Sequence, residues 1–185
     1  VNDAGLAVSL TFGGRQIVGT GFGVPLILRY VLQSCDTAEQ AGEVLARVPT
    51  HMSYNVTVLD AERRYLTAMM APDRKPALLT HAAVATNHQE RVEWADHARF
   101  TATVERERFL LQRLMLHVDP EKKFVETFLK PPLYSTAFAE GYGTLYTAVY
   151  RARKREMEMR WPGTTWSFSL TKFEEGQRRV VIPGT

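Results

Sequence analysis

Seven short segments of the chain are rich in β-forming residues, and turn residues or prolines separate them. They are residues 6–12, 53–59, 65–70, 82–86, 144–151, 156–161 and 165–170. Turns such as Asp60-Ala61, Pro72-Asp73 and Pro162-Gly163 join neighbouring segments. The pattern predicts antiparallel strands.

Four other segments carry apolar residues at helical spacing or begin and end on helix signals. They are residues 25–34, 38–47, 97–116 and 120–130. Pro25 stands in the first turn of the first helix, and Asp36-Thr37 supplies a cap for the second. Pro131-Pro132 stops the last one.

The order of elements is strand, two helices, several strands, two helices, several strands. Such segregation predicts an α+β layered fold and argues against a doubly wound parallel sheet. The chain has 185 residues, of which 45% are hydrophobic, and this suffices for one sizeable core. We expect residues 1–185 to form a single domain.

Charge gives little support to a nucleic-acid partner, because 23 Lys and Arg against 20 Asp and Glu leave a net charge of only +3. The basic run at Arg151, Arg153, Lys154 and Arg155 is followed by Glu156. A solvated hairpin end is favoured there over a phosphate-binding patch.

No segment approaches the roughly 18 consecutive apolar residues of a membrane span, and one cysteine excludes an internal disulfide, so we expect a cytoplasmic protein.

Most candidate chemistry has a simpler structural interpretation. The glycine-rich residues 19–23 lack the lysine and the spacing of phosphate-binding loops, so we interpret them as a flexible loop. Cys35 lies on the apolar face of the first helix, which favours a core residue over a nucleophile. The five histidines show no ligand spacing, and we expect neither a metal nor a cofactor.

Asn87 is more suggestive, because it ends the predicted strand at residues 82–86 where polar side chains would face a cleft. An asparagine amide in that position can donate a hydrogen bond to a developing oxyanion. By composition alone, a plain turn at the strand end is favoured over this role.

Four stretches resemble the isopenicillin-N acyltransferase family and, more distantly, the choloylglycine hydrolases and penicillin V acylases. They are residues 2–9 (Asn-Asp-Ala-Gly-Leu-Ala-Val-Ser), residues 54–60, residues 85–88 (Ala-Thr-Asn-His) ahead of residues 92–94, and residues 144–150. The resemblance covers nearly the whole chain. It implies an αββα sandwich, in which two antiparallel sheets lie between helical layers, as in N-terminal-nucleophile hydrolases.

The resemblance also implies roles for particular residues. Asn87 matches the asparagine that helps to form the oxyanion hole, and Thr11 stands near the position of a second polar group of that hole. Asn55 and His88 are expected substrate-pocket residues. The substrate would be a small acyl amide or thioester, and a homo-oligomer is compatible with the sequence.

In that family a cysteine with a free α-amino group attacks a linear amide. Its match, with the strands that carry it, would precede Val1, so we expect these residues to be the middle and C-terminal part of such a fold and to be inactive alone. A binding module that keeps the pocket without the chemistry is the alternative, and an unrelated α+β interaction domain is a third.

Overall fold

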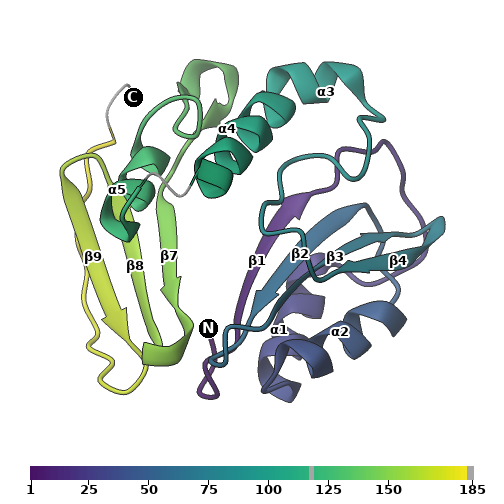
Figure 1. The fold of residues 1–185 in the computed structure, drawn as a ribbon, viewed down its shortest axis with the longest axis horizontal. Helices are drawn as coiled ribbons and strands as arrows, with labels where there is room; N and C mark the ends of the chain where they lie inside the picture. The colour runs from purple at the N-terminus through teal and green to yellow at the C-terminus, as the bar shows by residue number, and fades with distance from the viewer. Residues whose placement is uncertain (117–118, 183–185) are drawn as a thin grey trace.

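The computed structural model describes residues 1–116 and 119–182 (Figure 1). Its larger sheet is antiparallel, with the strands in the order β1 (Ala7–Phe12), β2 (Tyr54–Leu59), β3 (Tyr65–Ala71) and β4 (Arg74–Leu79). Thr11 of β1 stands opposite Asn55 of β2. This register places the polar residues of the two strands side by side.

Helices α1 (Val24–Ser34) and α2 (Ala38–Arg47) cover one face of this sheet (Figure 1). Thr37 and Gln40 form a capping box at the start of α2, in agreement with the predicted cap. The main core lies between these helices and the sheet, and its fully buried members include Leu6, Ile27, Val31, Leu45, Val56, Val58 and Met70. Apolar residues at alternate strand positions point to this side.

The intervening strand positions form the opposite face of the larger sheet, and several of them are polar. Thr57 stands opposite Thr67 in the register, their hydroxyls lie 2.9 Å apart, and Thr11 and Asn55 lie nearer the end of the same face. This face points toward the second half of the molecule (Figure 1). The candidate site is built on it.

A second antiparallel sheet contains β7 (Thr147–Arg151), β8 (Glu156–Trp161) and β9 (Thr164–Ser169). The basic run forms the turn of the β7–β8 hairpin, as predicted, and Arg151 pairs there with Glu121 and Glu158. A short hairpin of β5 (Thr136–Ala137) and β6 (Tyr142–Gly143) precedes this sheet. Single 3-10 turns lie at Thr127–Leu129, Phe138–Glu140 and Ala152–Lys154.

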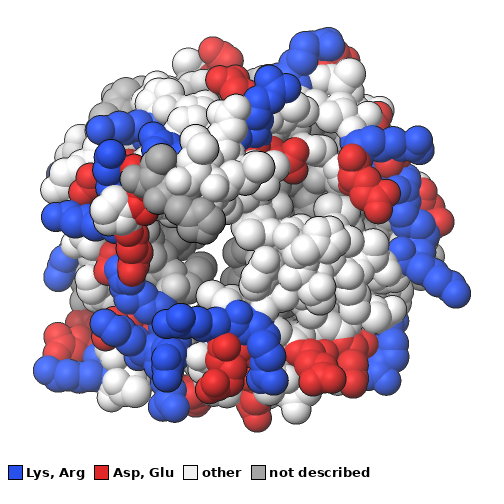
Figure 2. Space-filling view, viewed as in Figure 1, with Lys and Arg blue, Asp and Glu red and all other residues white. Residues whose placement is uncertain are grey.

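The two sheets face each other across an opening, which Figure 2 shows with uncharged surface to its right and charged side chains around its lower margin. At its lower end a cleft of about 690 Å³ is lined by residues of both halves, among them Leu59, Arg63 and Tyr150. The predicted α+β class with antiparallel sheets is confirmed.

The predicted helix at residues 97–116 is two helices, α3 (Ala95–Phe100) and α4 (Thr103–Leu116). Ala102 interrupts them in the left-handed conformation, at φ 48°. At the break, Arg106 Nε donates a hydrogen bond to the Thr101 carbonyl. Carbonyls at the end of a helix have no partner within the helix, and this side chain supplies one. The predicted last helix is shorter, at α5 (Glu121–Glu126).

The predicted strand at residues 82–86 is wrong, because these residues have no regular structure. The tight turn at Pro72-Asp73 returns the chain at once, so that β4 takes the edge position instead. Pro76 is tolerated there because an edge strand leaves alternate backbone N–H positions unpaired. The other predicted strands and the first two helices are confirmed to within a few residues.

Candidate carbonyl-binding site

Residues 82–89 cross the polar face of the larger sheet as an extended, irregular segment, and side chains of the sheet hold its backbone. The Thr67 hydroxyl donates to the Ala82 carbonyl over 3.2 Å, and the Thr11 hydroxyl donates to the Thr86 carbonyl over 2.9 Å. At the far end Gln89 Nε2 donates to the Met70 carbonyl. Side-chain donors therefore replace the strand pairing that the sequence suggested.

Asn55 is the central support of this segment. Its side-chain Nδ2 donates to the Thr86 carbonyl over 2.9 Å and to the His88 carbonyl over 2.8 Å, which clamps the backbone on both sides of Asn87. Asn55 is only 1% exposed, and its Oδ1 has no hydrogen-bond partner among the described residues. The residue predicted to line the substrate pocket thus lies beneath the segment.

The His88 ring is held from both of its nitrogens. Nδ1 lies 3.0 Å from the Thr103 hydroxyl and 3.2 Å from the Thr86 hydroxyl, and Nε2 lies 3.3 Å from a carboxylate oxygen of Glu107. The Thr103 hydroxyl also donates to the Thr86 hydroxyl. These contacts fasten α4 to the segment on the C-terminal side of Asn87.

Asn87 lies between these anchors, and its side chain is oriented by Arg106 of α4. Arg106 Nη2 donates to Asn87 Oδ1 over 2.6 Å. The amide therefore presents Nδ2, which has no partner among the described residues, as a free donor of two hydrogen bonds. A guanidinium bound to the amide oxygen also strengthens Nδ2 as a donor, since it withdraws electron density.

The Thr11 hydroxyl lies against the segment that carries Asn87. Its only hydroxyl proton is used in the hydrogen bond to the Thr86 carbonyl. A direct hydrogen bond from Thr11 to an oxyanion would require that bond to break. In this structure Thr11 positions the segment that carries Asn87.

Arg15 ties together the loops around the site. Arg15 is 7% exposed, makes two hydrogen bonds of 2.7 Å to Asp73, and lies 2.9 Å from Glu93, which also binds Arg74. Hydrogen bonding to Arg15 lowers the pKa of Asp73 from 3.8 to about 2. Burial opposes ionisation of Glu93, but the hydrogen bonds from Arg15 and Arg74 outweigh it and lower that pKa as well.

Gly14 approaches the segment more closely than any side chain could. Its φ is 68°, and a Cβ at this position would lie 2.3 Å from the Asn87 carbonyl oxygen. The loop after β1 therefore packs directly against the backbone of Asn87.

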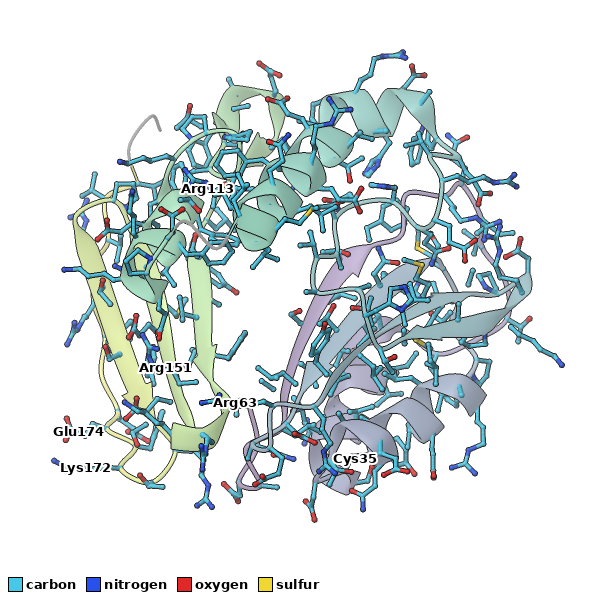
Figure 3. The ribbon with its side chains drawn as sticks, viewed as in Figure 1. Cys35, Arg63, Arg113, Arg151, Lys172 and Glu174 are labelled. Atoms are coloured by element: carbon cyan, nitrogen blue, oxygen red, sulfur yellow. The ribbon has the colours of Figure 1, made fainter. Side chains whose placement is uncertain are left out.

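The one thiol of the chain is remote from Asn87. Cys35 is 2% exposed and belongs to the core between α1, α2 and the larger sheet, as predicted. Figure 3 shows it beside these helices, away from the opening between the sheets. Within residues 1–116 and 119–182, no group of three His, Cys, Asp or Glu side chains could hold a metal ion, and no helix is long and apolar enough to cross a bilayer.

Arg106 is the residue of the candidate site that the sequence reasoning missed. Its only signal was a basic residue on an amphipathic helix that follows Asn87, and such residues usually lie on solvated faces. Besides holding Asn87, Arg106 lines a cleft of about 640 Å³ between α3, α4 and residues 131–144.

Two facing antiparallel sheets, with helices on one of them and an amide donor supported from the inner sheet face, define a layered α+β protein. A family model supports this class independently. The model of acyl-coenzyme A:6-aminopenicillanic acid acyl-transferase matches residues 1–166, and the chain belongs to this family. No curated protein gives a significant match.

Proposed function

We propose that this chain forms the carbonyl-binding part of a cysteine amidase or acyltransferase that acts on linear amides. The observation that carries the proposal is the Asn87 amide, whose oxygen is engaged by Arg106 while its nitrogen is free to donate. When a nucleophile attacks a carbonyl carbon, negative charge develops on the carbonyl oxygen. A fixed donor that faces this oxygen stabilises the transition state more than the substrate.

The supports of Asn87 make it a prearranged donor. Asn55 clamps the backbone on either side, and His88 and Thr103 fix the neighbouring turn to α4. Little reorganisation is then needed when charge develops on the substrate. In this proposal Asn87 contacts the reacting atoms, and Arg106, Asn55, Thr11 and His88 are positioning residues.

In this proposal the nucleophile comes from outside the described residues, because Cys35 is buried in the core on the other side of the larger sheet. We propose that a cysteine with a free α-amino group enters the opening between the two sheets. The family name makes an acyl thioester or amide the expected substrate class. A single free thiol suits a reducing compartment, so the proposed setting is cytoplasmic.

Two proteins test this proposal together. One is the purified 185-residue chain, and the other is the product of its native reading frame. We expect the chain alone to give no acyl-enzyme with phenylacetyl or fatty-acyl amides, and the native product to give an acyl-cysteine adduct by mass spectrometry. In the native product Asn87→Asp keeps the size of the side chain and a partner for Arg106 but removes the donor. It should lower the acylation rate by about 10²- to 10³-fold.

The second candidate is a non-catalytic binding module that keeps the fold. The remote position of Cys35 favours it, since the site then has no thiol of its own. A native product that lacks an N-terminal cysteine and binds simple amides without turnover would establish this alternative. A burst of acyl-enzyme from the 185-residue chain itself would contradict both.

A further inference from the structure

The cleft at the lower end of the opening lies where turns from distant parts of the chain meet. Residues 60–64 join β2 to β3, and residues 152–155 join β7 to β8. Gly5 contacts both turns, with a φ of 84°, and a Cβ there would lie 2.6 Å from the Ala152 carbonyl oxygen and 3.2 Å from the Ala61 Cβ. Both alanines line the cleft, so this close approach joins the two halves of the molecule beside it.

Both turns contribute basic residues to the lining of this cleft. Arg63 comes from the first turn, Arg153 and Lys154 come from the second, and all three are exposed. None of them makes a side-chain hydrogen bond or an ion pair with the described residues. Figure 2 shows basic side chains gathered at the lower margin of the opening, and Figure 3 shows Arg63 there between the two halves. Like charges that share a cleft repel one another unless an anion compensates them.

The two acidic residues of the lining are already engaged. Asp60 is 2% exposed, and its carboxylate accepts hydrogen bonds from three backbone N–H groups and from Arg64 Nε. Glu121 forms an ion pair with Arg151. Hydrogen bonding to Arg151 and, to a lesser degree, the charge of Lys154 lower the pKa of Glu121. The lining therefore keeps an excess of positive charge.

Arginine also occupies an unfavourable backbone conformation in each of the two turns. The φ of Arg63 is 66° and that of Arg155 is 56°. Glycine, asparagine or aspartate fits the left-handed region at a lower cost than arginine. Turn chemistry alone does not account for these residues, whereas a requirement for positive charge beside the cleft does.

Size and donor type indicate the class of ligand. The volume of about 690 Å³ is within the usual range for small-molecule sites. A guanidinium matches the oxygens of a phosphate with paired N–H donors, and a lysine ammonium adds a point charge. A single carboxylate needs only one such partner, so three cations around one cleft suit a group with several negative charges.

We propose that this cleft binds a diphosphate group, held by Arg63 from one half of the molecule and by Arg153 and Lys154 from the other. The inference goes beyond the proposed function and does not depend on it. Leu59 lines the cleft at the end of β2, whereas Asn55 near the start of the same strand supports the segment of the carbonyl site.

Isothermal titration calorimetry of the 185-residue chain with pyrophosphate tests the site. We expect pyrophosphate to bind more tightly than orthophosphate. Arg63→Asn removes a cation with a residue that tolerates the left-handed conformation. This variant, Arg153→Gln and Lys154→Gln should each weaken pyrophosphate by about three- to tenfold, and Arg63→Asn combined with Arg153→Gln by about 30-fold.

Arg29→Gln is the matched control. Arg29 is an exposed arginine of α1, on the far side of the larger sheet, and it has no ion pair among the described residues. The variant changes the net charge as Arg153→Gln does, but should alter the affinity by less than about twofold. Circular dichroism checks that each variant keeps the fold. Absence of pyrophosphate binding, affinity that the three cleft variants leave unchanged, or an equal loss in Arg29→Gln would overturn the proposal.

Titration with ADP shows what carries the diphosphate. ADP and pyrophosphate share this group and differ in the nucleoside. ADP binding that the same variants weaken would assign the site to a diphosphate ester, and binding of pyrophosphate alone would assign it to the inorganic anion. Both results support the site. The acylation test with Asn87→Asp concerns the carbonyl site, so its failure would leave the diphosphate result intact.

Discussion

Arg106 Nη2 and Asn87 Oδ1 lie 2.6 Å apart, and this contact sets the orientation of the Asn87 amide. Without it the amide could turn and present its oxygen, which would repel an oxyanion. The bond also connects α4 to the irregular segment that crosses the larger sheet. In the proposed function, the chemistry of the site therefore depends on a residue that makes no contact with the reacting carbonyl.

Replacement of Arg106 by methionine should release the Asn87 amide while keeping much of the aliphatic packing. We expect the side-chain NH₂ resonances of Asn87 to shift and broaden in ¹⁵N NMR spectra of the 185-residue chain. In a form that carries the nucleophile, acylation should fall by about tenfold or more. Arg106→Lys should partly restore the Asn87 NH₂ resonances and the acylation rate, because an ammonium can still donate to Oδ1. Unchanged Asn87 resonances in Arg106→Met would show that the contact does not orient the amide.

Asn55 should be important for stability as well as for the site. Asn55→Ala removes two hydrogen bonds to buried backbone carbonyls, and we expect a loss of about 2–4 kcal/mol in the free energy of unfolding. Urea denaturation measures this difference. Gln33→Ala on the exposed side of α1 is the control and should change stability by less than about 0.5 kcal/mol.

Gly14 should not tolerate a side chain. Its positive φ and the 2.3 Å distance from a Cβ to the Asn87 carbonyl oxygen both oppose alanine. Gly14→Ala should destabilise the protein by about 1–3 kcal/mol and shift the backbone resonances of Asn87. Gly176→Ala, where a Cβ meets nothing within 4 Å, is the matched control; an equal effect of the two variants would contradict the close approach.

Acid should weaken the attachment of the loops around the site. The pKa of Asp73 is lowered from 3.8 to about 2 by its hydrogen bonds to Arg15, so its stabilising contribution is complete above pH 4 and is lost as the pH falls toward 2. Asp73→Asn should flatten the dependence of thermal stability on pH in this window. Glu62→Gln, an exposed carboxylate without an ion pair among the described residues, should leave the dependence unchanged.

Cys35 should react with thiol reagents only when the core opens. The side chain is 2% exposed and packs among α1, α2 and the larger sheet. We expect slow modification in buffer and a steep rise in rate across the urea transition. Rapid labelling of the native chain by a small thiol reagent would place Cys35 at an accessible site and reopen its role as the nucleophile.

The sequence by itself determined the elements whose residues carry a local signal. The alternating strands at residues 53–59 and 65–70 and the capped helix at residues 38–47 each have a period or a cap that neighbouring residues define, and all three are confirmed. The apolar face of the first helix likewise placed Cys35 in the core. Neighbouring residues are enough to predict these elements, because the spacing of their apolar side chains matches a single buried face.

Only the tertiary structure decided how residues 82–89 are held and which way Asn87 points. The segment resembles a strand in composition, but its carbonyls bind Thr11, Asn55 and Thr67 of the sheet instead of another backbone. Those partners are 15 to 75 residues away in the chain, and a pattern within a short window contains no information about them. The role of Arg106 was hidden for the same reason, because a charged residue on a helix acquires a partner only when two distant segments meet.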